Sequence, residues 1–154
     1  MSTQGNTPVT CAKEALTQEF NGKPLTASVF GYQRPDDLVK GKGIVRLCRS
    51  DIVYSTVQVL QEGGENNMHA HPAQDGIWIV LKGRVKFYGK GDVVLAELGP
   101  LQGIHIPRGF YYWFESSSPE MLEILQVEAI DKSVKNERLN LTPPKDFATE
   151  IQRF

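Results

Sequence analysis

The sequence predicts an all-β fold built as a barrel or sandwich, and two observations lead to this prediction. Short apolar runs rich in Val, Ile, Tyr, Phe and Trp fill residues 44 to 130. Turn signals made of Gly, Pro and Asn separate these runs about every 8 to 12 residues, a spacing typical of small β-barrels and sandwiches. At 154 residues the chain is long enough for one domain with a self-sufficient core.

The chain divides into three parts. Residues 1–42 are mixed and polar, with a weakly helical patch at "TCAKEALTQEF", and we expect an N-terminal arm. Residues 131–154 are predicted to be a tail packing on the barrel, with Phe147, Ile151 and Phe154 at the spacing of a short C-terminal helix. Residues 43–130 form the predicted barrel, with strands expected at 44–49, 52–60, 67–71, 76–82, 84–88, 92–97, 103–106, 110–115 and 121–129.

Composition argues against several classes of partner. Apolar residues at 40% and charged residues at 23% are ordinary for a globular protein. The net charge of -1 gives no overall attraction to nucleic acid or an anionic membrane. No apolar run approaches the ~20 residues of a membrane span, and no secretory signal is visible. Because Cys11 and Cys48 lack metal-ligand spacing, we expect a cytoplasmic protein with reduced cysteines that binds neither nucleic acid nor membrane.

Two histidines one residue apart precede the apolar run "GIWIVLKG". Residues i and i+2 of a strand point to the same face, so His69 and His71 are expected to project side by side. Two imidazoles placed in this way can share one ion, and imidazole suits zinc, iron, copper, nickel and manganese. Alone the pattern is weak, because two histidines can also lie at a barrel rim with nothing to bind.

The spacing around these histidines resembles the cupin superfamily of single-domain, RmlC-like jelly-roll barrels. Gly63, His69, His71 and Gly83 fit the first cupin motif. The "PRG" of residues 107–109 fits the Pro-x-Gly of the second motif. The resemblance covers about residues 50 to 128. It implies a double-stranded β-helix, also called a jelly-roll barrel, with a site inside it.

The chain departs from the family at the metal ligands. Gly76 stands where cupins carry a glutamate, and Tyr112 stands where they carry a third histidine. The second motif also has Leu101 in place of its leading glycine and Ser116 in place of its closing asparagine. The resemblance therefore implies a degenerate metal motif in which two of four usual ligands remain.

Two cofactor states stay open at this point. In one, a divalent transition metal (Fe, Mn, Zn or Ni) binds His69 and His71, with Asp75 or His105 among the candidate replacement ligands. Asp75 is one residue out of phase with Gly76, so strand parity points it away unless the strand starts later. In the other state the protein binds no metal.

Aromatic side chains are expected to complete a pocket. If residue 76 faces inward as in the family, Trp78 faces inward too, because it is two residues further along the strand. Tyr112 is expected to face inward at the family's third-histidine position, and Phe110 and Phe114, two residues away on either side, should share its face. We take Trp78, Phe110, Phe114 and His105 as candidate substrate-binding residues, and His69, His71 and Tyr112 as candidate catalytic residues. Plain core filling is the alternative for the aromatic residues.

Two functions follow from this interpretation, and the sequence leaves open whether the chain is an enzyme. The first is a small-molecule enzyme of the cupin type: an isomerase or epimerase, a lyase or a dioxygenase. With a metal, the ion would polarise the substrate or activate oxygen; without one, a histidine and Tyr112 would act as base and acid, as in the sugar epimerases that the chain resembles. The second is a non-catalytic module that binds or senses a ligand. Either form is expected to be a homodimer, with part of residues 1–42 lying across the partner.

Overall fold

The computed structural model describes residues 16–38, 41–61, 67–144 and 151–154. The chain forms two compact units, residues 1–33 and 34–154. In the first unit, β1 (Thr17–Phe20) and β2 (Lys23–Thr26) form an antiparallel hairpin. Its turn residues Asn21 and Gly22 both have positive φ, 51° and 73°, as a two-residue Asn-Gly turn requires.

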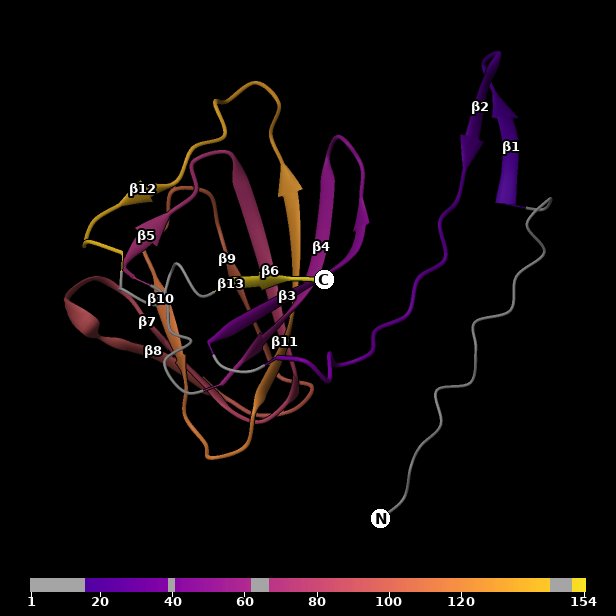
Figure 1. Cartoon of the computed structure of the whole chain (residues 1–154). Helices are drawn as coiled ribbons and strands as arrows, with labels where there is room; N and C mark the ends of the chain where they lie inside the picture. Colours follow the sequence, from indigo (N-terminus) through magenta and orange to yellow (C-terminus); the bar gives the residue numbers. More distant parts are fainter. Residues whose placement is uncertain (1–15, 39–40, 62–66, 145–150) are drawn as a thin grey trace. The chain divides into compact units, whose positions relative to one another are not determined.

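The second unit is a β-barrel made of a large sheet, a small sheet and a two-stranded pair (Figure 1). The large sheet has the strand order β13-β3-β4-β11-β6-β9. Its strands are β3 (Lys42–Arg49), β4 (Val53–Leu60), β6 (Gln74–Lys82), β9 (Gly103–Ile106), β11 (Leu122–Ile130) and β13 (Ile151–Arg153). The small sheet joins β10 (Trp113–Ser116), β7 (Val85–Tyr88) and β8 (Val94–Leu98), and β5 (His69–Ala70) pairs with β12 (Leu139–Asn140).

The core lies between the large and the small sheet and follows strand parity. On β6 the side chains alternate, so that Trp78 and Val80 are buried while Ile77 is 48% exposed. Across from them, Phe87 of β7 and Phe114 of β10 are fully buried. The same buried cluster also contains Leu60, Val85, Ile106, Tyr112, Leu122 and Ile124. This apolar packing fills one end of the barrel and leaves the other end to polar side chains.

All nine strands predicted for residues 44 to 130 are present, which confirms the all-β prediction. Their bounds agree within a few residues, except that β5 covers only His69–Ala70 of the predicted 67–71 and β10 starts at Trp113 instead of 110. The barrel unit begins at Arg34, so it takes in the end of the predicted arm as well as the tail.

Two helix predictions are wrong where the structure describes the chain. The patch at residues 10–20 ends in strand β1, Thr17–Phe20, and its first residues lie outside the described part. In the tail, Ile151 belongs to β13, which pairs in parallel with β3, and neither 131–144 nor 151–154 contains a helix. Phe147 lies outside the described residues. The helical spacing failed because the tail's backbone pairs with strands that are far away in sequence.

Gly83 closes the turn between β6 and β7 and offers a test of this packing. Its φ is +79°, and a Cβ added there would lie 2.9 Å from the carbonyl oxygen of Met121. We therefore expect Gly83→Ala to lower the free energy of unfolding by about 3 kcal/mol. Gly91→Ala is the matched control, because its φ is +71° but an added Cβ meets nothing within 4 Å; it should cost about 1 kcal/mol. Equal losses in urea denaturation would contradict this account.

The hairpin of β1 and β2 bears on the predicted homodimer. Every residue of the two strands is exposed, including Phe20 at 65% and Leu25 at 54%. Within its own unit β1 pairs only with β2 among the described residues, and a two-stranded hairpin by itself is only marginally stable. We propose that a second copy of the chain covers it. Light scattering of the full chain should then give a dimer at micromolar concentration, and a chain lacking residues 1–33 should give a monomer. A monomeric full chain would contradict the proposal.

Candidate functional site

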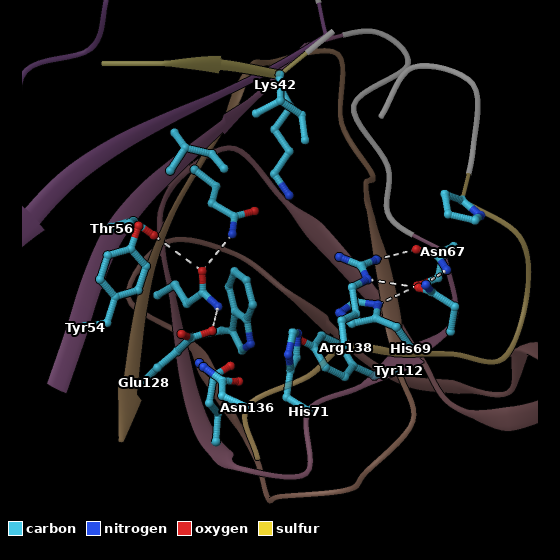
Figure 2. Close-up of a pocket in the computed structure, with 18 of the residues that line it drawn as sticks. Lys42, Tyr54, Thr56, Asn67, His69, His71, Tyr112, Glu128, Asn136 and Arg138 are labelled. Atoms are coloured by element: carbon cyan, nitrogen blue, oxygen red, sulfur yellow. Dashed lines mark hydrogen bonds between the residues drawn. The ribbon is translucent and has the colours of Figure 1, made fainter. Parts of the chain in front are cut away.

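A pocket of about 550 Å³ opens inside the barrel, at the end that the apolar core leaves free (Figure 2). Its walls come from the large sheet, from the β5–β12 pair and from the tail segment before β12. Four of the predicted site residues line it, and they are His69, His71, Trp78 and Tyr112.

His69 and His71 lie together in this pocket, as strand phase predicts. Their ring centroids are 5.0 Å apart in an edge-to-face arrangement. His69 is 2% exposed, and its Nδ1 lies 2.6 Å from the carbonyl oxygen of Asn67. Since a carbonyl only accepts hydrogen bonds, Nδ1 carries the proton and Nε2 of the neutral ring keeps its lone pair.

Both imidazoles are neutral at physiological pH. Burial lowers the pKa of His69 to about 3, and the nearby Arg138 guanidinium adds to this effect. Burial and Arg138 likewise lower the pKa of His71 to about 4. The two rings therefore act as hydrogen-bonding groups of fixed charge near pH 7.

Tyr112 is held against His69 by the backbone. An isolated β-bridge joins the two residues through two hydrogen bonds of 3.0 Å, and their ring centroids are 4.7 Å apart. Tyr112 is 3% exposed, and burial raises its pKa well above the usual value. Its phenol is therefore a protonated hydrogen-bond donor at neutral pH.

The indole of Trp78 lies beside the position where cupins carry their glutamate. A Cβ built on Gly76 would be 3.5 Å from Trp78 Nε1. This Nε1–H is buried and makes no hydrogen bond of good geometry among the described residues, although the Trp78 side chain is close enough to the Tyr112 phenol to act on its pKa. A Cβ at residue 76 would therefore be in van der Waals contact with the indole.

Four predicted site residues lie outside the pocket walls. Phe114 is fully buried but packs in the apolar core, so only the core alternative holds for it. Phe110 is 40% exposed and lines a separate surface groove beside Lys90 and Tyr111. His105 and Asp75 meet on the outer face of the large sheet, with His105 Nε2 3.3 Å from Asp75 Oδ2. Asp75 thus points away from the histidines, as its strand phase indicated.

These positions allow a test of whether the site suits a metal ion. Asp75 and His105, the predicted replacement ligands, lie on the outer face and cannot join His69 and His71. Within the described residues, no three His, Cys, Asp or Glu side chains gather into a group that could hold an ion. Arg138 adds a positive charge beside both histidines. This donor set does not fit a resident divalent metal.

A row of polar side chains on β4 and β11 forms the pocket wall that the sequence analysis missed. Gln126 Oε1 accepts hydrogen bonds from Gln58 Nε2 at 2.7 Å and Thr56 Oγ1 at 3.4 Å. Gln126 Nε2 in turn donates to Glu128 Oε1. The signal was available: these residues are in phase with the apolar, inward-facing Leu60 and Ile124 of the same strands.

Glu128 is the only acidic residue among the described residues that line the pocket. It is 8% exposed, and it lies directly opposite Gly76 in the pairing of β11 with β6. Burial raises its pKa to about 7. The chain thus has a carboxyl group on the strand next to the one where the family has its glutamate, and this group changes charge near neutral pH.

Cationic side chains also line the pocket. Lys42, at the start of β3, is 7% exposed, and burial lowers the pKa of its ammonium to about 7. Figure 2 shows Lys42 directed into the pocket and Arg138 beside Asn67 and His69. Arg138 Nη2 donates to Asn67 Oδ1, and its Nε donates to Asn140 Oδ1 at 3.0 Å. No sequence signal pointed to Arg138, because its partners lie far away or on an unpredicted strand.

Comparison with solved structures assigns the fold. A protein with a double-stranded β-helix domain from Klebsiella pneumoniae matches at TM-score 0.58 and 19% identity, over 75% of this chain and 99% of that one. The cupin domain of Cnp3 from Schizosaccharomyces pombe matches at TM-score 0.58 and 16% identity, over 72% and 79%. The polyketide cyclase RemF from Streptomyces resistomycificus matches at TM-score 0.51 and 22% identity, over 66% and 70%.

The chain is therefore a double-stranded β-helix barrel with an internal pocket. More particularly, it has the cupin fold, as the two motifs in the sequence implied. No family model and no curated protein matches the sequence. Among the described residues, no helix is long and apolar enough to cross a membrane.

The charge of Glu128 predicts how stability depends on pH. Its pKa is raised from 4.5 to about 7 in the folded chain, so it stabilises the fold below pH 4.5 and this contribution is lost as pH rises through 7. Relative to the wild type, Glu128→Gln should gain about 3 kcal/mol of unfolding free energy between these two pH values. Chemical denaturation at a series of pH values measures the difference, and a constant difference would contradict a buried, titrating carboxyl group.

Proposed function

We propose that this chain is a small-molecule enzyme of the cupin type that moves protons inside the barrel without a resident metal ion. Of the reaction classes expected from the sequence, isomerisation and epimerisation proceed by proton transfer. An elimination also needs only an acid and a base, because the base removes the proton from carbon while the leaving group departs with its bonding electrons and takes a proton from the acid. The observation that carries the proposal is Glu128: a buried carboxyl group with a pKa of about 7, facing a pocket. A general base works best when its pKa lies near the operating pH.

The neighbouring side chains suit a substrate in that position. Tyr112 keeps its proton and can donate it to a substrate oxygen that gains negative charge. His69 and His71 are neutral, with Nε2 of His69 free to accept a hydrogen bond. Gln126 donates to Glu128 and fixes the orientation of its carboxyl group. In this scheme Glu128 takes the proton and Tyr112 supplies one.

The fold comparison is compatible with catalysis but does not specify it. One matched structure is a polyketide cyclase, which is an enzyme, and another is the cupin domain of Cnp3. Sequence identities of 16% to 22% support an assignment of the fold only, so the proposal rests on the residues of this pocket.

A non-catalytic binding module is the second candidate, and one observation favours it. The pKa values of His69 and His71, about 3 and about 4, make both rings poor bases at neutral pH. In a pocket lined by such groups, the histidines bind a ligand through hydrogen bonds while their own protonation state stays the same near neutral pH. Under this alternative, Glu128 adjusts binding to pH and performs no chemistry.

Deuterium exchange distinguishes the two candidates without a known product. The protein is incubated in D₂O with a panel of hydroxy acids, sugar acids and sugar phosphates, and mass spectrometry detects deuterium at carbon. We expect exchange into at least one compound, slowed about 100-fold or more in Glu128→Gln and unaffected by EDTA. Glu97→Gln is the control, because Glu97 is 44% exposed on β8 and pairs with Lys86.

Three results would count against the proposal. Binding without exchange would favour the non-catalytic module. Exchange that Glu128→Gln leaves unchanged would remove Glu128 from the mechanism. Exchange abolished by EDTA and restored by a divalent metal would replace the proposed chemistry with metal-dependent chemistry.

A further inference from the structure

We infer that the pocket recognises a small hydroxylated organic anion, with its carboxylate or phosphate on Arg138 and Lys42 and its hydroxyl groups on Trp78 and Gln58. The inference rests on the proposed function in taking the barrel pocket as the site, and it names the class of substrate. It does not depend on whether Glu128 performs catalysis.

Arg138 is oriented by its neighbours in a way that leaves one edge of the guanidinium available. Nε donates to Asn140 Oδ1, and Nη2 donates to Asn67 Oδ1. Asn67 is itself fixed, because its Nδ2 donates to Asn140 Oδ1 at 2.9 Å and to the carbonyl oxygen of Thr142 at 2.8 Å. Nη1 has no hydrogen-bond partner within the described residues, and no carboxylate there pairs with Arg138. An arginine held in this way presents a fork that matches a carboxylate or phosphate.

The charges that line the pocket favour an anion. Among the described residues, Lys42, Arg138 and Arg153 line it together with a single acid, Glu128. Arg138 and Arg153 both help to lower the pKa of Lys42, so the positive charges act on one another. Burial holds the pKa of Glu128 near 7, which limits the negative charge that it supplies. An anionic group placed among these cations would relieve their mutual repulsion.

Two deeper groups indicate the uncharged part of the ligand. Trp78 Nε1 is a donor and Gln58 Oε1 is an acceptor, and both are buried. Neither makes a hydrogen bond of good geometry in the described part of the chain, although the Trp78 side chain is close enough to the Tyr112 phenol to lower its pKa slightly against the larger effect of burial. Trp78 is 1% exposed and Gln58 is 6% exposed, and both line the pocket. A buried polar atom without a partner is costly, so a ligand that supplies both partners gains affinity. A hydroxyl group both accepts and donates.

The size and lining of the pocket agree with such a ligand. A volume of about 550 Å³ lies within the usual range for small-molecule sites. A neutral sugar would satisfy Trp78 and Gln58 but would leave the Arg138 fork without its acceptor. An inorganic anion would satisfy the fork but leave Trp78 and Gln58 unpaired. A sugar acid or sugar phosphate meets both requirements.

Four probes and the full-length chain test this assignment by isothermal titration calorimetry. Gluconate carries the carboxylate, glucose 6-phosphate carries the phosphate, glucose is neutral, and inorganic phosphate lacks the hydroxylated part. We expect gluconate or glucose 6-phosphate to bind at millimolar concentration or below, at least about 10-fold tighter than glucose and inorganic phosphate. The stronger of the two identifies the anionic group.

Variants then locate the contacts. Arg138→Gln should lower the affinity for the anion about 10- to 100-fold. Arg138→Lys should restore only part of this affinity, because lysine keeps the positive charge but lacks the two parallel N–H donors of the guanidinium. Trp78→Phe, which removes only the indole donor, should weaken binding about 5-fold. Arg84→Gln is the matched control, since Arg84 is 48% exposed and pairs with Glu97 outside the pocket; it should bind like the wild type.

Several outcomes would overturn the inference. They are the absence of binding by both charged sugars, binding of glucose or inorganic phosphate as tight as theirs, and an affinity that Arg138→Gln leaves unchanged. If one of these is found while Glu128-dependent deuterium exchange persists, the substrate class is wrong and the proposed enzyme stands. If Arg138-dependent binding is found without deuterium exchange, the proposed class of ligand is right, and the chain is a non-catalytic binding module.

Discussion

The pairing of β11 with both β4 and β6 is the constraint on which the rest of the barrel depends. β11 is hydrogen-bonded along nearly its whole length on both sides, which fixes the register of three adjacent strands. A slip of one residue would exchange the two faces of β11. In the observed register, Leu122 and Ile124 fall in the apolar core, whereas Gln126 and Glu128 fall in the pocket. One strand therefore supplies both the stability of the barrel and the acid of its site.

The same register places a carboxyl group directly opposite residue 76, which is the position of the metal-binding glutamate in the cupin motif that the sequence resembles. Gly76 and Glu128 are direct partners across β6 and β11. The carboxyl group of Glu128 comes from the strand next to that of Gly76, and it accepts a hydrogen bond from the side-chain amide of Gln126. A carboxyl group in this environment is a titrating acid, whereas beside two histidines and a third ligand it would be a ligand for a cation.

Local pattern was enough to predict the barrel and the centre of the site. Alternation along β6 placed Trp78 inward, and the i, i+2 spacing placed His69 and His71 together. The prediction for Phe110 failed because residues 107–112 form a turn and a single bridge, so parity counted back from Tyr112 does not hold. The prediction for His105 failed because its register partner is Ile77, which faces outward.

The remaining site residues depend on contacts that are distant in sequence. Arg138 is held by Asn67, 71 residues away, and its segment shows no periodicity that would reveal an inward-facing side chain. Lys42 lies at the start of β3. One edge of β3 pairs with β13, which is more than 100 residues further along the chain, so the local sequence does not reveal this pairing. Glu128 differs from these two, because strand parity counted from Ile124 already points it inward.

The parallel pairing of β13 with β3 has a consequence for how the protein folds. The first strand of the barrel remains unpaired on one edge until residues 151–153 have been synthesised and have docked beside it. Lys42 of that first strand and Arg153 of that last one both line the pocket. A nascent chain can thus form its apolar core before it has a complete binding site. Because pairings between distant strands form slowly, the ability to bind ligand should be the last property that the folding chain acquires.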